Sequence, residues 1–552
     1  MNKRILILGG YGVFGGYLSE YLASLPDTEI LVAGRSAAKA RAFCDQHGGS
    51  PVTLDISAPD VASKIAALAP HTVVDAAGPF QAYGAAPYRI AETAIACGAH
   101  YLDLSDDAAF TAGIGQLDGP ARAAGVMVLS GASSVPALSS AAARALSEGL
   151  ADIHVIESAI LPGNRAPRGL SVIRSILRQA GQPLRLWRGG EWESVTGWSD
   201  RQSLSLSAKG APPLKSRWAS LIGAPDLVLF PEHFKARSVL FRAGLDLKLM
   251  HGGLGCLSAL VRIGALKSLA PFSRPLKWAA DSLEPFGSDR GAMRVRVAGE
   301  TDSGAFEERV WTLVISSGDG PRVPTIPARI LCSKIIAGDV TPGAQPSLEA
   351  FTLDEAEQAL TALDAVTERT AQPLTLLFEH ALGPSFSQLP PALQDLHAVI
   401  DVRHWRGKAS VIRGTNLISR LVGGLVGFPP STPSTDVHVA MRRTAKGETW
   451  TRRFGRHTFR SYLAPAKHNA PGHVTERFGF LNFRIDLAAS TQDLSFPVSR
   501  GKALGLPLPA FLLPASDTRE YVDAAGRACF DVSIALPLIG KVVGYKGYLT
   551  PV

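Results

Sequence analysis

The chain has 552 residues, which is too long for one ordinary domain and long enough for two or three hydrophobic cores. Its composition, 46% hydrophobic and 19% charged, is that of a folded globular protein. The formal net charge of +8 is modest for this length, so it does not by itself predict a nucleic-acid-binding protein. An acidic or phosphorylated ligand and an anionic membrane surface both remain open.

The cysteines and the apolar runs bear on the cellular compartment. The sequence has no C-x-x-C motif and no Cys/His spacing typical of a metal site, so we predict reduced thiols and no metal. It has no convincing secretory signal and no apolar run of about twenty residues, and we therefore expect a cytoplasmic protein without a transmembrane span. The cysteines are Cys44, Cys97, Cys256, Cys332 and Cys529.

The stretch RILILGGYGVFGG, residues 4–16, joins a short apolar run to a cluster of glycines. Gly10, Gly12 and Gly15 follow the order G-x-G-x-x-G before an amphipathic stretch, Val13 to Leu25, which predicts strand, tight turn and helix. In a dinucleotide site, the first glycine makes the turn, the second lets the backbone approach a pyrophosphate, and the third lets the helix pack on the strand. Glycines also serve plain turns, so the pattern alone is not specific.

The next apolar segment, Glu29 to Ala33, is followed by Gly34, Arg35 and Ser36, at about the distance where the second strand of such a unit ends. An acidic residue there would accept hydrogen bonds from the ribose hydroxyls of NAD, whereas the guanidinium of Arg35 suits a 2′-phosphate. We therefore predict NADP(H) as the cofactor. The alternative is a solvated surface arginine.

Residues 1 to about 135 alternate between strand-like and Ala-rich helix-like segments, which is the pattern of a doubly wound parallel sheet. Ligands bind at the carboxyl edge of such sheets. The strands are expected near residues 4–9, 29–33, 51–54, 72–76, 100–103 and 126–129.

Two later segments reach the same sheet edge. Asp55 follows the third strand and is placed either to meet the adenine end of a cofactor or to cap a helix. The small residues of AAGPF, 76–80, follow the fourth strand and allow a close backbone approach. The predicted cofactor-binding residues are Gly10, Gly12, Val13, Phe14, Gly15, Arg35, Ser36, Asp55, Ala77 and Gly78.

Several motifs in chain order resemble those of the saccharopine dehydrogenase-like oxidoreductases: GGYGVFGG (9–16), AGR (33–35), AAGPF (76–80), CGAHYLDLSDD (97–107) and GASSVPALSS (131–140). Two later segments, FGSDRGAM (286–293) and GDGPRVPTIPARILCSKIIAGDVTPGA (318–344), are also similar to segments of that family.

This resemblance implies a Rossmann NADP-binding domain over 1–140 and a mixed α/β domain over 141–324 that covers the nicotinamide and helps to form a homodimer. It also implies a return segment over 325–370 that packs on the first domain. Saccharopine-type enzymes bind a dicarboxylic amino acid through charged side chains, and these ligands are not found in the middle region. The substrate therefore stays open.

From about residue 371 to 552 the sequence changes to alternating apolar and polar residues with Gly and Pro in the turns, which predicts a mostly antiparallel β domain, a barrel or a sandwich. The segment resembles an uncharacterised family, the DUF4166 type, which brings no activity with it. The motifs are LPPALQDLH (389–397), RRFG (452–455), ERFGFLNFRI (476–485), LGLPLP (504–509) and LPLIGKVVGYKGYL (536–549).

Basic residues outnumber acidic ones between Arg403 and Arg484, which is typical of a solvated sheet face or of a site for an acidic lipid or acyl carrier. No stacking or groove-reading motif supports nucleic acid as a partner. The stretch Leu417 to Phe428 is either an amphipathic element that touches a membrane or an element that packs on the β domain.

The fifth strand supplies the candidate catalytic residues. Hydride transfer needs a proton donor or acceptor near the nicotinamide. Tyr101 and Asp103 share one strand face at the carboxyl end, so they are candidates to line the nicotinamide pocket. Buried structural roles are the alternative.

These patterns together predict an NADP(H)-dependent oxidoreductase of the saccharopine dehydrogenase-like type, with a C-terminal domain that binds or positions a small-molecule or acyl-lipid substrate. One alternative is a non-catalytic dinucleotide-binding protein whose β domain binds a lipid or a partner. Another is an enoyl or acyl-lipid reductase. Turnover separates the enzyme from the binding protein, and dependence on chain length separates an acyl substrate from an amino acid.

Overall fold

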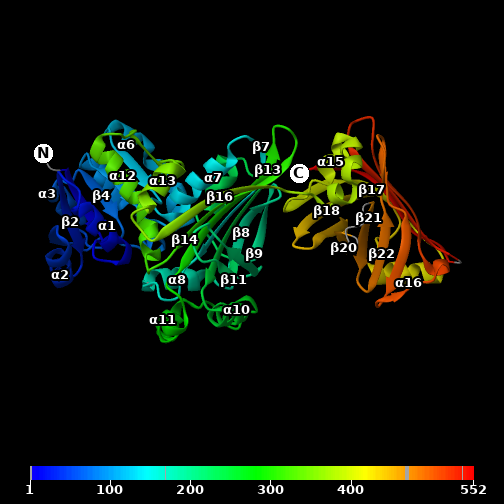
Figure 1. The fold of residues 1–552 in the computed structure, drawn as a ribbon, viewed down its shortest axis with the longest axis horizontal. Helices are drawn as coiled ribbons and strands as arrows, with labels where there is room; N and C mark the ends of the chain where they lie inside the picture. The colour runs from blue at the N-terminus through cyan, green and yellow to red at the C-terminus, as the bar shows by residue number, and fades with distance from the viewer. Residues whose placement is uncertain (1–2, 168, 466–471, 538) are drawn as a thin grey trace. The chain divides into compact units, whose positions relative to one another are not determined.

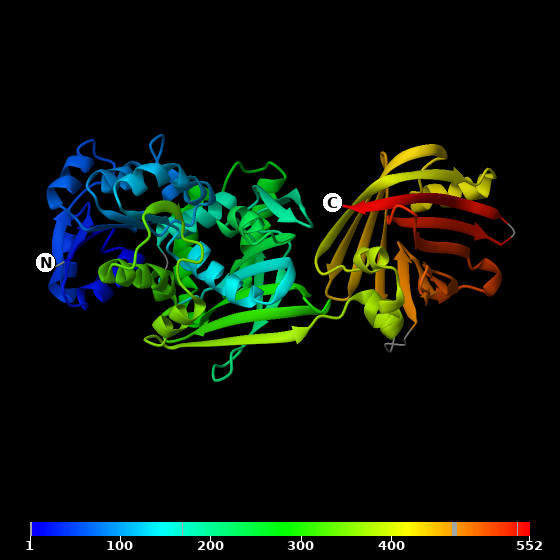
Figure 2. The same ribbon diagram turned by 90° about the horizontal axis from the view of Figure 1, so that it is seen from above.

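The computed structural model describes residues 3–167, 169–465, 472–537 and 539–552 (Figures 1 and 2). The chain divides into two compact units. The first unit comprises Met1–Trp187, Trp192–Ser303 and Glu308–Gln372, and the second comprises Arg188–Glu191, Gly304–Glu307 and Pro373–Val552. None of the described helices is long and apolar enough to cross a membrane.

The first unit begins with a seven-stranded parallel sheet in the order β15-β6-β5-β4-β1-β2-β3. The apolar run Ile5 to Leu8 is at most 1% exposed, because its side chains alternate between two buried cores, one on each face. The predicted doubly wound sheet is thus confirmed. Its strands are β1 (Lys3–Leu8), β2 (Thr28–Gly34), β3 (Ser50–Thr53), β4 (Thr72–Asp75), β5 (His100–Asp103), β6 (Met127–Ser130) and β15 (Gly343–Pro346).

Helices cover this sheet, and two of them come from the later part of the chain, next to the segment that supplies β15 (Figure 1). The helices are α1 (Val13–Ala23), α2 (Ala37–His47), α3 (Val61–Leu68), α4 (Arg89–Ala96), α5 (Ala108–Gly113), α6 (Asp118–Ala123), α12 (Ile326–Ala337) and α13 (Leu353–Leu360).

A second, mixed sheet in the first unit has the order β10-β11-β12-β7-β13-β14-β16. Its long central strand β7 pairs parallel with β12 and antiparallel with β13. The strands are β7 (Leu150–Leu161), β10 (Gln202–Leu206), β11 (Leu214–Leu221), β12 (Ser238–Leu245), β13 (Gly291–Thr301), β14 (Phe306–Ile315) and β16 (Ala365–Pro373). A separate hairpin joins β8 (Pro183–Arg188) to β9 (Glu191–Thr196).

Five helices accompany the mixed sheet. Two of them, α7 and α9, pack against its central strands, and α8, α10 and α11 lie beside one end of the sheet (Figure 1). The helices are α7 (Ser139–Ser147), α8 (Leu170–Gln179), α9 (Asp226–His233), α10 (Lys248–Arg262) and α11 (Ser273–Ser282).

The second unit is built on one continuous antiparallel sheet of thirteen strands, in the order β23-β24-β27-β28-β29-β17-β18-β19-β20-β21-β22-β25-β26. Among the described residues all these strands belong to one sheet, and no pairing is found between its edge strands β23 and β26. The sheet curls around an interior in Figures 1 and 2.

The larger strands of this curled sheet are β17 (Val402–Arg413), β18 (Thr432–Thr444), β19 (Gly447–Phe454), β20 (His457–Pro465), β21 (His473–Phe478), β22 (Leu481–Asp486), β25 (Val498–Ala503), β27 (Ala515–Val522), β28 (Ala528–Leu536) and β29 (Gly540–Pro551). The short ones are β23 (Ala488–Ala489), β24 (Asp493–Ser495) and β26 (Leu506–Pro507). Its helices are α14 (Leu377–Leu382), α15 (Pro391–Leu396) and α16 (Leu417–Val426).

Candidate functional site

The turn between β1 and α1 needs glycine at several positions. Gly9 has a φ of +71°, and a Cβ on Gly10 would lie 2.8 Å from the carbonyl oxygen of Ile7. A Cβ on Gly15 would overlap the carbonyl oxygen of Gly9, so α1 packs directly on the turn. Gly12 precedes the helix as its N-terminal flanking residue. The sequence prediction missed Gly9, although the doubled glycine at 9 and 10 was a signal for it.

The N-terminus of α1 offers donors to an anion. The helix begins at Val13, and the amides of Val13, Phe14 and Gly15 belong to the first turn, where a helix supplies no internal acceptors. The first turn carries no acidic residue. This end of the helix therefore suits a pyrophosphate.

The loop after β4 lies against the glycine turn. A Cβ on Gly9 would come within 2.8 Å of the carbonyl oxygen of Ala76 and 2.9 Å of the Cα of Ala77. The Asp75 carboxylate shapes the loop, because it accepts hydrogen bonds from the Ala77 amide at 3.0 Å and from the Tyr83 hydroxyl at 2.9 Å. The structure thus brings the predicted residues Ala77 and Gly78 together with the glycine turn at one edge of the sheet.

The turn after β2 carries the predicted phosphate-reading residues. Arg35 is exposed, and no ion pair to its guanidinium occurs among residues that the structure describes. Ser36 caps α2, and its hydroxyl accepts a hydrogen bond from the Lys39 amide at 3.3 Å. The turn therefore presents a free guanidinium, a hydroxyl and the first turn of a helix to solvent, which are the groups that bind a phosphate.

Tyr11 links the glycine turn to this second turn. Its hydroxyl accepts a hydrogen bond from the Ser36 amide at 2.9 Å, and its ring covers Gly34, where a Cβ would lie 2.5 Å from the phenol oxygen. Tyr11 and Gly34 therefore hold the two turns in one fixed arrangement. The sequence carried no signal for this contact, since the two residues are far apart along the chain.

Asp55 forms a turn of its own. Its exposed carboxylate accepts a hydrogen bond from the Ser57 amide at 2.9 Å, two residues further on. The capping interpretation therefore has a hydrogen bond to support it, although the cap closes a turn and not a helix. Contact of Asp55 with the adenine end of a cofactor stays a prediction.

The two candidate catalytic residues lie inside the sheet. Tyr101 and Asp103 are 1% and 0% exposed, and Tyr101 packs in the core on one face of the sheet. One Asp103 oxygen accepts hydrogen bonds from the Ser105 amide, the Ser130 hydroxyl and the Gly131 amide, at 2.8–2.9 Å. Asp103 therefore fixes the turns after β5 and β6, and contact of either residue with nicotinamide stays a prediction.

Two buried carboxyl groups sit side by side at this edge, because Asp75 and Asp103 are register partners in β4 and β5. Burial raises the pKa of Asp75 to about 6 and that of Asp103 to about 7, where the charge of Asp75 adds to the effect. Burial and the nearby carboxylates also raise the pKa of Tyr83 and Tyr101 above that of an ordinary tyrosine. These acids change charge close to neutral pH, which sequence alone did not reveal.

A third buried acid lies between α9, α7 and β7. Asp226 is 0% exposed and accepts hydrogen bonds from the hydroxyls of Ser139 and Ser158, at 3.1 and 3.0 Å. Burial raises its pKa to about 7. Ser139 belongs to the motif GASSVPALSS, so one role of that motif is to anchor the start of α7 on α9 and on β7 of the mixed sheet.

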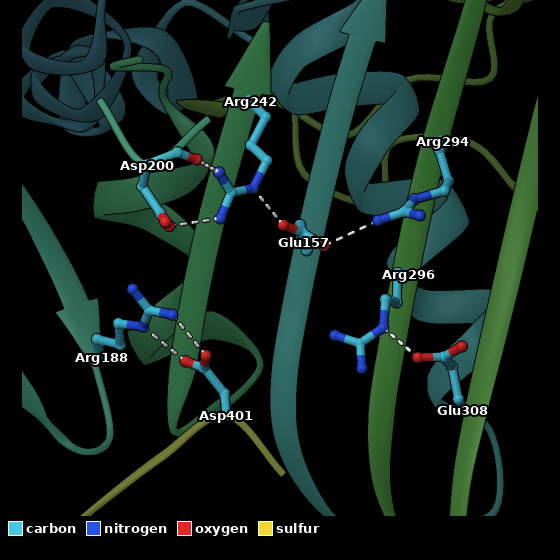
Figure 3. A network of polar contacts seen from close by, with 8 residues as sticks. All are labelled: Glu157, Arg188, Asp200, Arg242, Arg294, Arg296, Glu308 and Asp401. Atoms are coloured by element: carbon cyan, nitrogen blue, oxygen red, sulfur yellow. Dashed lines mark hydrogen bonds and ion pairs between the residues drawn. The ribbon is translucent and has the colours of Figure 1, made fainter. Parts of the chain in front are cut away.

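One face of the mixed sheet carries a buried ionic network (Figure 3). The Glu157 carboxylate in β7 accepts from the Arg242 Nε at 2.6 Å and from an Arg294 nitrogen at 2.8 Å. Arg242 is 0% exposed and also binds the Asp200 carboxylate at 2.8 Å. Each charge has an opposite partner, so the network fixes the register of three neighbouring strands.

The curled sheet of the second unit encloses an apolar cavity of about 400 Å³. Val437, Val439, Phe483 and Val532 are typical of its lining. The charged residues of the lining are paired. Arg452 lies 3.3 Å from Glu476 and donates to the Ser461 hydroxyl at 2.7 Å, and Glu520 lies 2.7 Å from the His397 ring. The cavity therefore suits an apolar ligand.

One small cluster in the second unit has metal-type ligands. Ligand atoms of Glu191, His404 and His438 all lie within 4.8 Å of one another. The Arg406 guanidinium forms an ion pair with Glu191, and burial together with neighbouring positive charges lowers the pKa of His438. Arg406 already neutralises the carboxylate that a cation would need.

A parallel sheet whose glycine turn meets the N-terminus of a helix, beside an arginine after the second strand, defines a dinucleotide-binding unit of the Rossmann class. Comparison with family models makes the assignment specific. Residues 5–129 match the saccharopine dehydrogenase NADP binding domain, and residues 389–549 match the domain of unknown function DUF4166. Residues 5–129 and 389–549 are thus similar to these two families, and both predicted resemblances are confirmed.

Solved structures add only distant neighbours. Apo saccharopine dehydrogenase (L-Glu forming) from Saccharomyces cerevisiae is 16% identical, covers 67% of this chain and 100% of its own, and has a TM-score of 0.49. Biliverdin reductase from Synechocystis sp. PCC 6803, in complex with biliverdin and NADP+, is 13% identical, covers 65% and 96%, and has a TM-score of 0.30. No curated protein matches the chain.

Proposed function

We propose that the first unit is an NADP(H)-dependent oxidoreductase that binds its cofactor at the carboxyl edge of the parallel sheet. The observation that carries the proposal is the contact of the three turns, Gly9–Gly15, Gly34–Ser36 and Ala76–Gly78, within the segment that matches an NADP-binding family. Bound NADPH supplies a hydride, and the residues of this edge bind and orient the cofactor.

Each turn has a separate task in this proposal. The amides of Val13, Phe14 and Gly15 bind the pyrophosphate at the N-terminus of α1. Arg35 binds the 2′-phosphate, assisted by Ser36 and by Lys39 in the first turn of α2. Ala77 has a small side chain and Gly78 has none, so the rings of the cofactor can approach the backbone at these two residues. Asp75 holds the turn after β4 in place, and Asp103 holds the neighbouring turns after β5 and β6.

The first test measures cofactor choice. NADPH and NADH are titrated into purified full-length protein while nicotinamide fluorescence is followed. We expect NADPH to bind more tightly, and Arg35→Ala to weaken NADPH about 10- to 100-fold while NADH changes little, because one charge-assisted contact to the phosphate is lost. Arg41→Ala is the matched control, since Arg41 is another exposed arginine, within the helix α2 that follows Arg35.

Three results would contradict the proposal. Equal weakening by Arg35→Ala and Arg41→Ala would mean that the 2′-phosphate is not bound at Arg35. Binding of neither nucleotide would leave the first unit without its proposed cofactor. NADPH binding with no oxidation of NADPH by any acyl or amino-acid substrate would favour the non-catalytic alternative, in which the dinucleotide is retained without turnover.

A further inference from the structure

The curled sheet has two ends that differ in character. Hairpin connectivity brings the turns near residues 413–432, 478–481 and 503–506, the end of β28 and the start of β29 to one end, because successive antiparallel strands reverse direction there. The opposite end carries α14 and α15, where the Phe378 and His397 rings stack at 3.8 Å and are 0% exposed. Figure 1 shows α15 and α16 at these opposite ends.

The cavity reaches the surface at the end that carries α16. Phe480 and Leu512 line the cavity and are also 49% and 45% exposed. Val422 and Val426 of α16 line it as well, so this helix forms part of the cavity wall. We call this end, formed by residues 412–428, 477–485, 500–514, 535–537 and 539–545, the open end.

Large apolar side chains project from the open end into solvent. Leu417, Ile418 and Leu421 occupy the face of α16 away from the cavity, and Leu417 and Leu421 are 84% and 76% exposed. Leu504, Leu506 and Phe511, from β26 and the turns on either side of it, are also exposed at this end of the sheet. Exposed apolar side chains that gather around a cavity mouth, and are not scattered singly, mark an interaction surface.

The charge of the open end is mostly positive. The residues that form it include seven basic ones and no aspartate or glutamate, and the two acids that directly flank them, Glu476 and Asp486, pair with Arg452 and Arg484. The basic residues are Arg413, Arg420, Arg477, Arg484, Arg500, Lys502 and Lys541. Apolar side chains surrounded by positive charge complement an anionic bilayer, where leucine and phenylalanine enter the acyl region and arginine and lysine bind the headgroups.

We propose that the open end docks on an anionic membrane and that the cavity takes up one acyl chain of a lipid from it. The polar residues of the cavity wall already have partners, Arg452 with Glu476 and Glu520 with His397, so the interior binds the apolar chain and leaves the headgroup at the basic rim. The cavity volume lies in the range of small-ligand pockets. This proposal goes beyond the dinucleotide site and does not depend on it.

The docking test uses full-length protein and sedimentation with vesicles, without nucleotide. Vesicles of phosphatidylglycerol and phosphatidylcholine are compared with vesicles of phosphatidylcholine alone. We expect binding to the anionic vesicles, and we expect Leu417→Asp/Leu421→Asp to reduce it about tenfold or more. The matched control is Leu249→Asp/Ile263→Asp in the first unit, where both side chains are more than 70% exposed.

The cavity test uses a fluorescent polyene fatty acid added to the same protein. Ile534→Trp fills the cavity, and we expect it to abolish binding of the fatty acid while vesicle binding is retained. If Ile534→Trp fails to fold, as judged by circular dichroism, Thr518→Trp fills the same cavity from the neighbouring strand.

Three outcomes overturn the proposal. Equal binding to both kinds of vesicle would mean that the basic rim does not contribute to binding. If Leu249→Asp/Ile263→Asp reduced vesicle binding as much as Leu417→Asp/Leu421→Asp, the protein would not dock specifically through α16. Fatty-acid binding without any vesicle binding leaves a site for a free acyl compound instead of a membrane lipid. Because no nucleotide is used, none of these outcomes bears on the proposed oxidoreductase function.

Discussion

The dinucleotide edge of the first unit and the cavity of the second unit are built in opposite ways. The first consists of backbone groups in three short turns, where single glycines decide how closely the segments approach. The second consists of side chains from many strands, each of which contributes one apolar surface. A site made of local backbone geometry is sensitive to one residue, whereas a site made of distributed side chains tolerates many single changes.

The strongest test of this difference is a change in the glycine turn. In Gly15→Val the new side chain would overlap the backbone oxygen of Gly9, so the helix must move away from the turn. We expect nucleotide binding to fall below detection, at least 100-fold, and the first unit to lose about 1–3 kcal/mol of stability. Nicotinamide fluorescence and urea unfolding measure the two effects.

The control is Gly119→Ala in α6, where a Cβ would meet no atom within 4 Å. It should leave nucleotide binding unchanged. On the cavity side, Val439→Ala should change fatty-acid binding less than threefold, because many other residues line the same space. If Val439→Ala removed binding as completely as Gly15→Val removes the nucleotide, the contrast between the two sites would be wrong.

In the ionic network of the mixed sheet, several strands contribute side chains, yet the stability of the network depends on one residue, Glu157, because the charges are buried. Glu157→Ala would leave Arg242 buried beside only Asp200, and Arg294 without this partner. We expect a loss of about 3–5 kcal/mol in unfolding free energy, because uncompensated buried charge is costly. The comparison is Arg122→Ala, which removes the exposed ion pair with Asp118 and should cost less than about 1 kcal/mol.

Each unit holds a buried acid whose pKa is raised to about 7, Asp103 in the first and Glu448 in the second, in both cases chiefly by burial. An acid whose pKa is higher in the folded state than in the unfolded chain favours folding while it is protonated. That stability is lost as the pH rises from about 4 to about 7, on the order of 1–4 kcal/mol for a fully buried group. Above this range no further loss comes from the group.

Asp103→Asn and Glu448→Gln should flatten this decline for their own unit only. Urea unfolding between pH 5 and pH 8, followed by nucleotide release for the first unit and by fatty-acid release for the second, separates the two. An unchanged pH dependence in Asp103→Asn would mean that another group, such as Asp75 with its pKa of about 6, causes the decline.

The same contrast explains what the sequence could predict. The run Ile5 to Leu8, the glycine turn and Arg35 lie within one supersecondary unit, so spacing alone predicted the parallel sheet and the turns at its carboxyl edge. The partners of Asp226, by contrast, come from helices and strands more than sixty residues away. Periodicity shows that such a residue is buried but not which side chains surround it.

The second unit shows the same limit on a larger scale. Alternation identified its strands, and the excess of basic residues was visible in the sequence. The cavity was not visible in the sequence. The register of all thirteen strands determines which face of each strand points inward. The exposed face of α16 was equally hidden, since an amphipathic pattern gives a helix two faces without saying which one packs on the sheet.

The smallest expected effect concerns Asp55, whose two predicted roles are contact with the cofactor and capping. Asp55→Asn keeps an oxygen that can accept a hydrogen bond from the Ser57 amide. If Asp55 only closes the turn, this substitution should change the stability by less than about 0.5 kcal/mol and the NADPH affinity by less than about twofold. Asp55→Ala removes the cap and should cost about 0.5–1 kcal/mol. If Asp55 also contacts the cofactor, Asp55→Ala will weaken NADPH severalfold beyond what the loss of stability explains. Titration of both variants with NADPH therefore decides whether the cofactor site includes Asp55, after the third strand, or ends at Arg35 and Ser36.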